Sequence, residues 1–255
     1  MKILTFNVLN KWGTKTPDKR DELTLEMLAK EKPAIFGFQE FDDRYRDDVR
    51  MLEGIAALGY KEVAPELRSW NAIFYDPKKL SLISGGDEDF IDGTVYDHYP
   101  VNTYSRFRTI THGLFESDAG RFIFFSTHYD YNRERAITER NQESEARQLI
   151  ARVKELSREY DCPAIVVGDY NSHIDEMAGK AMLEAGFIDT HEIAAKKDNT
   201  ASCAKDISFP VEGDYSKAID HVFVLGDFAV DEYRTILNYR DASDHCPVTV
   251  ELMAK

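Results

Sequence analysis

The segment 164–172 constrains the fold of this chain more than any other stretch. An apolar run, Ala164 to Val167, is followed by Gly168, which is typical of a short buried strand that ends in a tight turn. Because residues i and i+2 of an extended segment point the same way, we expect Asp169 and Asn171 to face one spot at the end of this strand. Such a pair can hold and activate a water molecule, although the same residue types also form ordinary surface turns.

Similar apolar runs and helical periodicities recur along the chain and predict a mixture of strands and helices. Turns with Gly, Pro and Asp separate the strands between residues 72 and 129, which favours antiparallel hairpins and excludes a purely parallel sheet. Two polar stretches, Asp87 to Tyr104 and Asp189 to Tyr215, have no clear period, and we predict a long loop for the first. The predicted strands are Met1–Val8, Ala34–Phe38, Ala72–Tyr75, Leu80–Ile83, Thr111–Phe115, Arg121–Tyr129, Ala164–Val167, Ala218–Leu225, Phe228–Tyr233 and Val248–Met253, and the predicted helices are Asp21–Lys30, Arg44–Leu58, Thr138–Tyr160 and Glu176–Ala185.

The length fits one large domain or two small ones, and because the sequence shows no linker we expect one domain over residues 1–255. Hydrophobic residues make up 43% of the chain, which is enough for a sizeable core. No apolar run reaches the length of a membrane span, and the N-terminus alternates like a strand rather than a secretory signal. We therefore expect a cytoplasmic protein. Three cysteines without Cys-x-x-Cys spacing fit neither a zinc site nor a disulfide framework.

The formal net charge of −14 bears on the substrate more than on the reaction. A strongly acidic surface repels polyanions, which argues against a processive or non-specific DNA-binding protein. A local basic patch or bound metal ions would still accept one phosphate group.

Polar groups follow most of the predicted strands at their C-terminal ends, where α/β enzymes tend to place their sites. The carboxylates among them are hard oxygen donors, which suit Mg²⁺ or Mn²⁺ beside a phosphate ester. They lack the His and Cys spacing that zinc sites show. The six clusters are Asn7, Gln39-Glu40, Thr127-His128, Asp169-Asn171, Asp220-His221 and Ser243-Asp244-His245.

With these clusters the chain resembles the endonuclease/exonuclease/phosphatase superfamily, the metal-dependent phosphoesterases related to pancreatic-type deoxyribonuclease. Seven matching pieces occur in the order that the family has and span essentially the whole chain. They are Thr5-Phe6-Asn7-Val8-Leu9, Phe38-Gln39-Glu40, Ala72-Ile73-Phe74-Tyr75, Ser126-Thr127-His128, Gly168-Asp169-Tyr170-Asn171, Ile219-Asp220-His221-Val222-Phe223-Val224 and Ser243-Asp244-His245-Cys246-Pro247-Val248.

The resemblance implies an α/β fold, a four-layer α/β/β/α sandwich of two mixed, mostly antiparallel sheets flanked by helices, with the site at one end. It also implies a metal site, for Mg²⁺ or alternatively Mn²⁺, in which Glu40 is the main carboxylate, Asn7 lies beside it and Asp244 completes the sphere. The implied catalytic roles are as follows: Asp169 and Asn171 orient or deprotonate the attacking water, Asp220 holds His245 against the phosphate, and His128 binds the phosphate from the other side or assists the leaving group.

Several of these roles have alternatives. Asn7, Gln39 and Asn171 could merely cap turns. His128 could be a satisfied core histidine at the end of a hydrophobic strand. His221 stands where the family usually has an aromatic residue, and we expect it to pack rather than catalyse. Either Asp169 or His245 could be the general base, and the number of metal ions stays open as well.

Three further residues are candidates for binding substrate. Arg106 and Arg108 are phosphate contacts or else solvated cations. Asn71 belongs to a predicted substrate loop. After His128 the sequence departs from the usual pattern of the family, so that Asp130 has no assigned role.

We therefore expect a magnesium-dependent phosphoester hydrolase, a phosphodiesterase or phosphatase that acts on a small or lipid-like substrate. The alternative is a nuclease of the same fold, disfavoured by the net charge and by substrate loops that are acidic and aromatic rather than rich in lysine. A non-catalytic binding protein is the third possibility, but every expected site position holds a chemically competent residue. No protein partner is implied.

Overall fold

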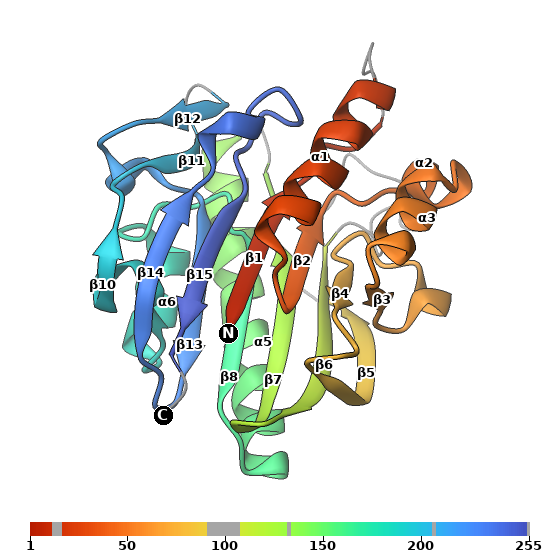
Figure 1. Cartoon of the computed structure of the whole chain (residues 1–255). Helices are drawn as coiled ribbons and strands as arrows, with labels where there is room; N and C mark the ends of the chain where they lie inside the picture. The colour runs from red at the N-terminus through yellow and green to blue at the C-terminus, as the bar shows by residue number, and fades with distance from the viewer. Residues whose placement is uncertain (12–16, 91–107, 132–133, 206–207, 254–255) are drawn as a thin grey trace.

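Two mixed β-sheets pack face to face in the computed structural model, and helices cover the outer face of each sheet (Figure 1). The structure describes residues 1–11, 17–90, 108–131, 134–205 and 208–253. This arrangement confirms the predicted four-layer sandwich.

The first sheet has seven strands, of which β1 with β2 and β10 with β14 form parallel pairs and the others antiparallel pairs. In spatial order its strands are β10 (Ala194–Lys197), β14 (Val230–Thr235), β15 (Val248–Leu252), β1 (Lys2–Asn7), β2 (Ile35–Gln39), β4 (Ile73–Tyr75) and β3 (Lys61–Glu62).

The second sheet has six strands, and only β7 and β8 form a parallel pair in it. Its order is β5 (Ser81–Asp89), β6 (Thr109–Ser117), β7 (Gly120–His128), β8 (Ala164–Asp169), β13 (Asp220–Leu225) and β9 (Ile188–Asp189). A separate two-stranded hairpin consists of β11 (Ala201–Ala204) and β12 (Phe209–Val211).

Three apolar clusters hold the four layers together, one between the sheets and one under each outer layer of helices. Because both faces of the central strands are covered, these strands read as continuous apolar runs, as in segment 164–167. The described helices are α1 (Pro17–Glu31), α2 (Asp43–Asp47), α3 (Arg50–Ala57), α5 (Arg135–Tyr160), α6 (Met177–Glu184) and α7 (Thr190–Ile193), with 3₁₀ turns η1 (Pro65–Leu67), η2 (Tyr215–Lys217) and η3 (Leu237–Tyr239).

Strand register brings the polar strand ends to one end of the sandwich. In the second sheet, His128 at the end of β7 and Asp220 at the start of antiparallel β13 both pair with Asp169 at the end of β8. In the first sheet, parallel pairing of β1 and β2 places Asn7 beside Gln39. Residues that are far apart in the sequence therefore meet at one edge of the fold.

A buried polar bridge joins the two sheets near this end. Gln39 is fully buried, and its amide accepts a hydrogen bond from Thr5 Oγ1 at 3.2 Å and donates one to Ser126 Oγ at 3.1 Å. A Cβ at Gly37 would lie 2.7 Å from Cγ2 of Val167, so glycine is needed for this close approach of the sheets. The bridge satisfies the buried amide of Gln39 and fixes the strand that leads into Glu40.

The prediction of one helix over Arg44–Leu58 is wrong, because α2 and α3 are separate. Asp42 caps α2 through its side chain, and Asp48 leaves the helical region at ψ 83°. The carboxylate of Asp48 instead binds the guanidinium of Arg50. This local side-chain bonding competes with a continuous helix.

The strand predicted over Leu80–Ile83 is longer than expected, because pairing with β6 continues as far as Asp89. Asp87 to Asp89 thus belong to β5 and not to the predicted loop, and residues 91–104 of that loop lie outside the described residues. The polar stretch Asp189 to Tyr215 contains α7, β10 and the β11–β12 hairpin.

The other predicted elements are confirmed, with ends shifted by no more than about one helical turn. None of the helices in the described part of the chain combines the length and the apolar character needed to cross a bilayer.

Candidate active site

A cavity of about 300 Å³ opens where the polar strand ends meet. Among the residues expected from the sequence, Asn7 and Asp220 lie directly behind the lining and are hydrogen-bonded to it. The lining residues are Asn10, Glu40, Arg108, His128, Tyr131, Asp169, Asn171, Cys203, Ala204, Lys205, Ser208, Ile219, Asp244 and His245.

Asp169 lies at the centre of this site, at the end of β8, and is 1% exposed. Its Oδ2 accepts a hydrogen bond from Asn7 Nδ2 at 2.9 Å and lies 3.3 Å from His128 Nε2 and 3.6 Å from His245 Nε2. Burial raises the pKa of Asp169 to about 7, although the charge of His245 acts to lower it. A carboxyl group with a pKa near neutrality is suited to accept a proton.

Asn171 faces the same cavity, but the extended segment that we expected between it and Asp169 is wrong. Asn171 has φ 46°, in the left-handed region that Asn tolerates. Its backbone N–H donates to Asp169 Oδ1 at 2.9 Å, and its Nδ2 donates to the carbonyl of Tyr129 at 3.0 Å and lies 3.1 Å from His128 Nε2. The turn and the site are therefore the same structure, because the turn-forming bonds aim the amide.

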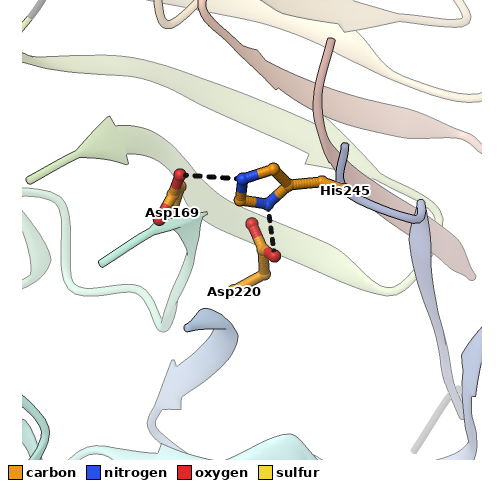
Figure 2. Close-up of side chains that lie close together, drawn as sticks. All are labelled: Asp169, Asp220 and His245. Carbon is orange, nitrogen blue, oxygen red and sulfur yellow. Dashed lines mark hydrogen bonds and ion pairs between the residues drawn. The ribbon is translucent and has the colours of Figure 1, made fainter. Parts of the chain in front are cut away.

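His245 is held between two carboxylates (Figure 2). Its Nδ1 lies 2.8 Å from Asp220 Oδ2, and since a carboxylate only accepts, Nδ1 carries the proton. Burial acts to lower the pKa of His245, but the negative charges of Asp220 and Asp169 outweigh it and raise the pKa well above the ordinary value. The imidazolium form is favoured and can donate to an anion.

His128 has the opposite charge state. Burial lowers its pKa well below the ordinary value, and the positive charges of Arg108 and His245 lower it further. The site thus contains one protonated and one neutral histidine on the two sides of Asp169.

Glu40 and Asp244 form what we call the acidic wall of the cavity. Glu40 Oε2 accepts the backbone N–H of Asn10 at 2.9 Å and Glu40 Oε1 accepts Asn7 Nδ2 at 3.2 Å, while Ser243 donates to Asp244 Oδ1 at 3.2 Å. Both carboxylates are half-buried. Neither has an ion-pair partner among the residues that the structure describes.

One guanidinium ties the loop before Asp244 to the loop after β1, which carries Asn10, a hydrogen-bond partner of Glu40. Arg20 of α1 is buried; it donates through Nε to the carbonyl of Ala242 at 3.0 Å and through a terminal nitrogen to the carbonyl of Val8 at 2.7 Å. The first contact holds the loop before Asp244 and the second the loop after β1. A charged donor shared by two loops fixes their separation.

The acidic wall fits a divalent metal ion, because two carboxylates without an ion-pair partner among the described residues face one cavity and amide groups lie beside them. In this arrangement Asn7 Oδ1 accepts the backbone N–H of Leu9 at 2.9 Å, so Asn7 would rotate its amide to offer oxygen to a metal. Asp169, Asp220 and His245 also place ligand atoms within 4.8 Å of one another, but His245 and Asp220 are already hydrogen-bonded to each other.

Two basic side chains reach the cavity lining, Arg108 just before β6 and Lys205 just after β11. Lys205 Nζ lies 3.1 Å from Glu176 Oε2, and its side chain is 15% exposed. Sequence reasoning missed Lys205, because it belongs to a polar stretch without a motif. It also missed Asn10, for which a signal existed, since Asn10 follows the end of β1 by three residues.

The structure does not bring every candidate to the cavity. Asn71 is fully buried outside the lining, where its Nδ2 donates to Thr109 Oγ1 at 2.9 Å. Arg106 lies outside the described residues. Asp130 accepts a hydrogen bond from Asn141 of α5 at 2.8 Å, and His221 packs in the core against the rings of Tyr170 and Phe223, as expected.

Comparison with known proteins identifies the family of this chain. Residues 4–245 match the model of the Endonuclease/Exonuclease/phosphatase family. No curated protein sequence matches the chain.

Solved structures with the same fold belong to proteins of different functions. Mannosyl-6-phosphatase Bt3783 of Bacteroides thetaiotaomicron has a TM-score of 0.75 and 23% identity, with 99% of each chain covered. The catalytic domain of human Nocturnin, with a bound sulfate anion, has a TM-score of 0.72 and 16% identity over 100% of this chain and 94% of the other. D. rerio TDP2, complexed with a single-strand DNA product, has a TM-score of 0.69 and 14% identity over 99% and 98%.

At these identities the solved structures share the fold with this chain, whereas the family model extends over nearly its whole length. The chain therefore belongs to the endonuclease/exonuclease/phosphatase family, whose members are hydrolases that act on phosphoester bonds.

Proposed function

We propose that this protein is a divalent-metal-dependent hydrolase of a small phosphate ester. The observation that carries the proposal is one cavity in which the acidic wall, which has no ion-pair partner in the described part of the chain, adjoins Asp169 and the buried His245–Asp220 pair. Phosphoryl transfer requires charge neutralisation at the phosphate oxygens and an oriented nucleophile, and this cavity offers groups for both.

The metal end of the site consists of Glu40 and Asp244, with Asn7 beside them. These residues would hold Mg²⁺ or Mn²⁺, which supplies positive charge at the phosphate oxygens and polarises the ester. Hard oxygen donors make either ion a better fit than zinc.

Asp169 is the group that accepts the proton of the attacking water. Its raised pKa suits a base near neutral pH, whereas His245 is already protonated and serves as a donor to a non-bridging phosphate oxygen. Asp220 keeps Nδ1 of His245 protonated. Asn171 and the neutral His128 contact the phosphate on the side opposite His245 and orient the water.

The substrate is a phosphate ester of a small alcohol. A cavity of about 300 Å³ is near the lower end of the range for ligand pockets, roughly 300 to 1,000 Å³. The net charge of −14 disfavours long polyanions. The similarity to a mannosyl-6-phosphatase supports a sugar phosphate as the first compound to test.

The test is phosphate-ester hydrolysis by the purified chain with Mg²⁺ or Mn²⁺. The panel contains p-nitrophenyl phosphate, bis-p-nitrophenyl phosphate, mannose 6-phosphate and supercoiled plasmid. We expect metal-dependent hydrolysis of a small ester that EDTA and His245→Ala abolish. The matched control is His112→Ala, which removes a half-buried imidazole that packs on Phe125 outside the cavity lining.

Two results would overturn the proposal. Plasmid cleavage without hydrolysis of any small ester would assign the site to a nuclease. No activity on any compound of the panel with either metal, together with no metal-induced change in melting temperature, would reject the proposal of a metal-dependent hydrolase.

A further inference from the structure

Strand β11 of the separate hairpin reaches the His245–Asp220 pair through a side chain that no sequence motif includes. Ser202 is 1% exposed, and its hydroxyl donates a hydrogen bond to Asp220 Oδ2. The same oxygen lies 2.8 Å from His245 Nδ1. Because a carboxylate oxygen only accepts, both groups must be donors to it.

The other oxygen of this carboxylate is in a different situation. Asp220 Oδ1 is buried and has no hydrogen-bond partner in the described part of the chain. Two donors therefore converge on Oδ2 and none holds Oδ1. The terminal torsion of Asp is broad, so the Ser202 hydroxyl, as the second donor to the oxygen that His245 meets, is the contact that limits rotation of the carboxylate.

The backbone fixes Ser202 relative to both of its partners. The carbonyl of Ser202 accepts the backbone N–H of Cys246 at 3.0 Å, one residue after His245. On the other side, Ala204 forms an antiparallel bridge with Ala218, two residues before Asp220. These two backbone contacts join β11 to β13 and to the His245 loop, and they place the Ser202 hydroxyl next to Asp220.

We propose that Ser202 is a positioning residue that acts through Asp220 to orient the His245 imidazole toward the substrate phosphate. Without the hydroxyl, the carboxylate of Asp220 is free to rotate and the direction of His245 Nε2 is no longer fixed. Small errors in the placement of a donor lower the rate of the chemical step more than they weaken substrate binding. The inference rests on the proposed function only in naming phosphate as the group that His245 meets.

The kinetic test compares Ser202→Ala with Ser202→Thr, which keeps a hydroxyl, and with the control Thr249→Val. Thr249 is 2% exposed, and its hydroxyl donates to a backbone carbonyl in the first sheet at 3.4 Å, so the control loses a buried hydroxyl outside the cavity lining. For Ser202→Ala we expect kcat to fall about tenfold or more, the factor that a hydrogen bond to a charged group is worth. KM and the Mg²⁺ affinity stay nearly unchanged, and Ser202→Thr restores most of kcat.

An unchanged kcat in Ser202→Ala would overturn the proposal. So would a loss in Ser202→Ala that is matched by the control variant, because that pattern is expected from a merely structural hydroxyl. If Ser202→Thr proves unstable in a melting experiment, the comparison of Ser202→Ala with Thr249→Val still decides the question.

A second measurement needs neither substrate nor metal. The Nδ1 proton of His245, bonded to Asp220, should give a low-field proton NMR resonance in the folded protein. We expect this resonance to shift or broaden in Ser202→Ala and to persist in Thr249→Val, and an unaltered resonance in Ser202→Ala would contradict the positioning role. A shifted resonance in a protein with no esterase activity would instead retain the positioning role and reject the proposed function.

Discussion

Two pairs of carboxylates meet at the same cavity and differ in how their charge is balanced. The acidic wall, Glu40 and Asp244, is half-buried and has no protein cation among the described residues. Asp169 and Asp220 are almost fully buried, and both face His245. A buried carboxylate requires a partner inside the protein, whereas a partly exposed pair can take its cation from outside. Surroundings, and not residue type, give the two pairs a different charge balance.

The strongest test of this difference is Asp169→Asn, because an amide cannot accept the proton of the attacking water. We expect activity to fall by a factor of about 10² to 10⁴, while Mg²⁺ affinity stays near that of the unaltered protein. Steady-state kinetics and calorimetric metal titration measure the two quantities.

Asp189→Asn is the matched control for that substitution. Asp189 is another buried carboxyl group of the second sheet, outside the cavity lining, and accepts the Tyr215 hydroxyl at 2.9 Å. If Asp189→Asn lost as much activity as Asp169→Asn, the effect would reflect stability and not proton transfer.

The converse change removes the acidic wall. Glu40→Gln or Asp244→Asn should lower Mg²⁺ affinity about 10- to 100-fold, the range seen when groups that support a metal site are lost. Asp220→Asn should leave that affinity within a few-fold, although activity falls. Mg²⁺ titration followed by thermal unfolding measures the metal affinity of each variant. Equal loss of Mg²⁺ affinity in all three variants would erase the distinction between the two pairs.

A smaller effect is expected at the basic part of the cavity. Lys205→Met should raise KM for a phosphomonoester up to about tenfold, because a charge-assisted contact is lost, with little change in metal affinity. Lys196→Met is the control, since Lys196 is 70% exposed and pairs with Asp231 on the surface. Unchanged KM in Lys205→Met would mean that Lys205 serves only to hold Glu176.

The smallest effect concerns Glu31, a carboxylate of a third kind, ion-paired with Lys2 and Arg234 away from the cavity. Burial acts to raise the pKa of Glu31. The hydrogen bonds from Arg234 and Lys2 outweigh burial and lower the pKa to below its ordinary value of 4.5. A lowered folded-state pKa means that the pair stabilises the protein above the unfolded-state value. This stabilisation is lost as the pH falls through the folded-state value.

Glu31→Gln should therefore lower the free energy of unfolding at neutral pH by no more than about 1 kcal/mol. The difference from the unaltered protein should shrink in acid. Urea denaturation at neutral pH and at about pH 3 tests the sign, and a difference that grew on acidification would contradict it.

The sequence by itself determined the elements whose signal is local. Continuous apolar runs marked the central strands, since covered sheets bury both faces of a strand. The polar residues after those runs, among them Glu40, Asp169 and His245, line one cavity. The motifs and their order resembled the family, and that resemblance implied the sandwich.

Only the tertiary structure decided the features that depend on partners far along the chain. Lys205 and Ser202 come to the site through the β11–β12 hairpin, which is held by Cys246 and Ala218 and has no periodic signal of its own. The helix break at Asp48 and the left-handed turn at Asn171 depend on side-chain hydrogen bonds that compete with regular backbone structure. The neutral state of His128 was likewise beyond the sequence, because burial and the positive charges of Arg108 and His245 lower its pKa.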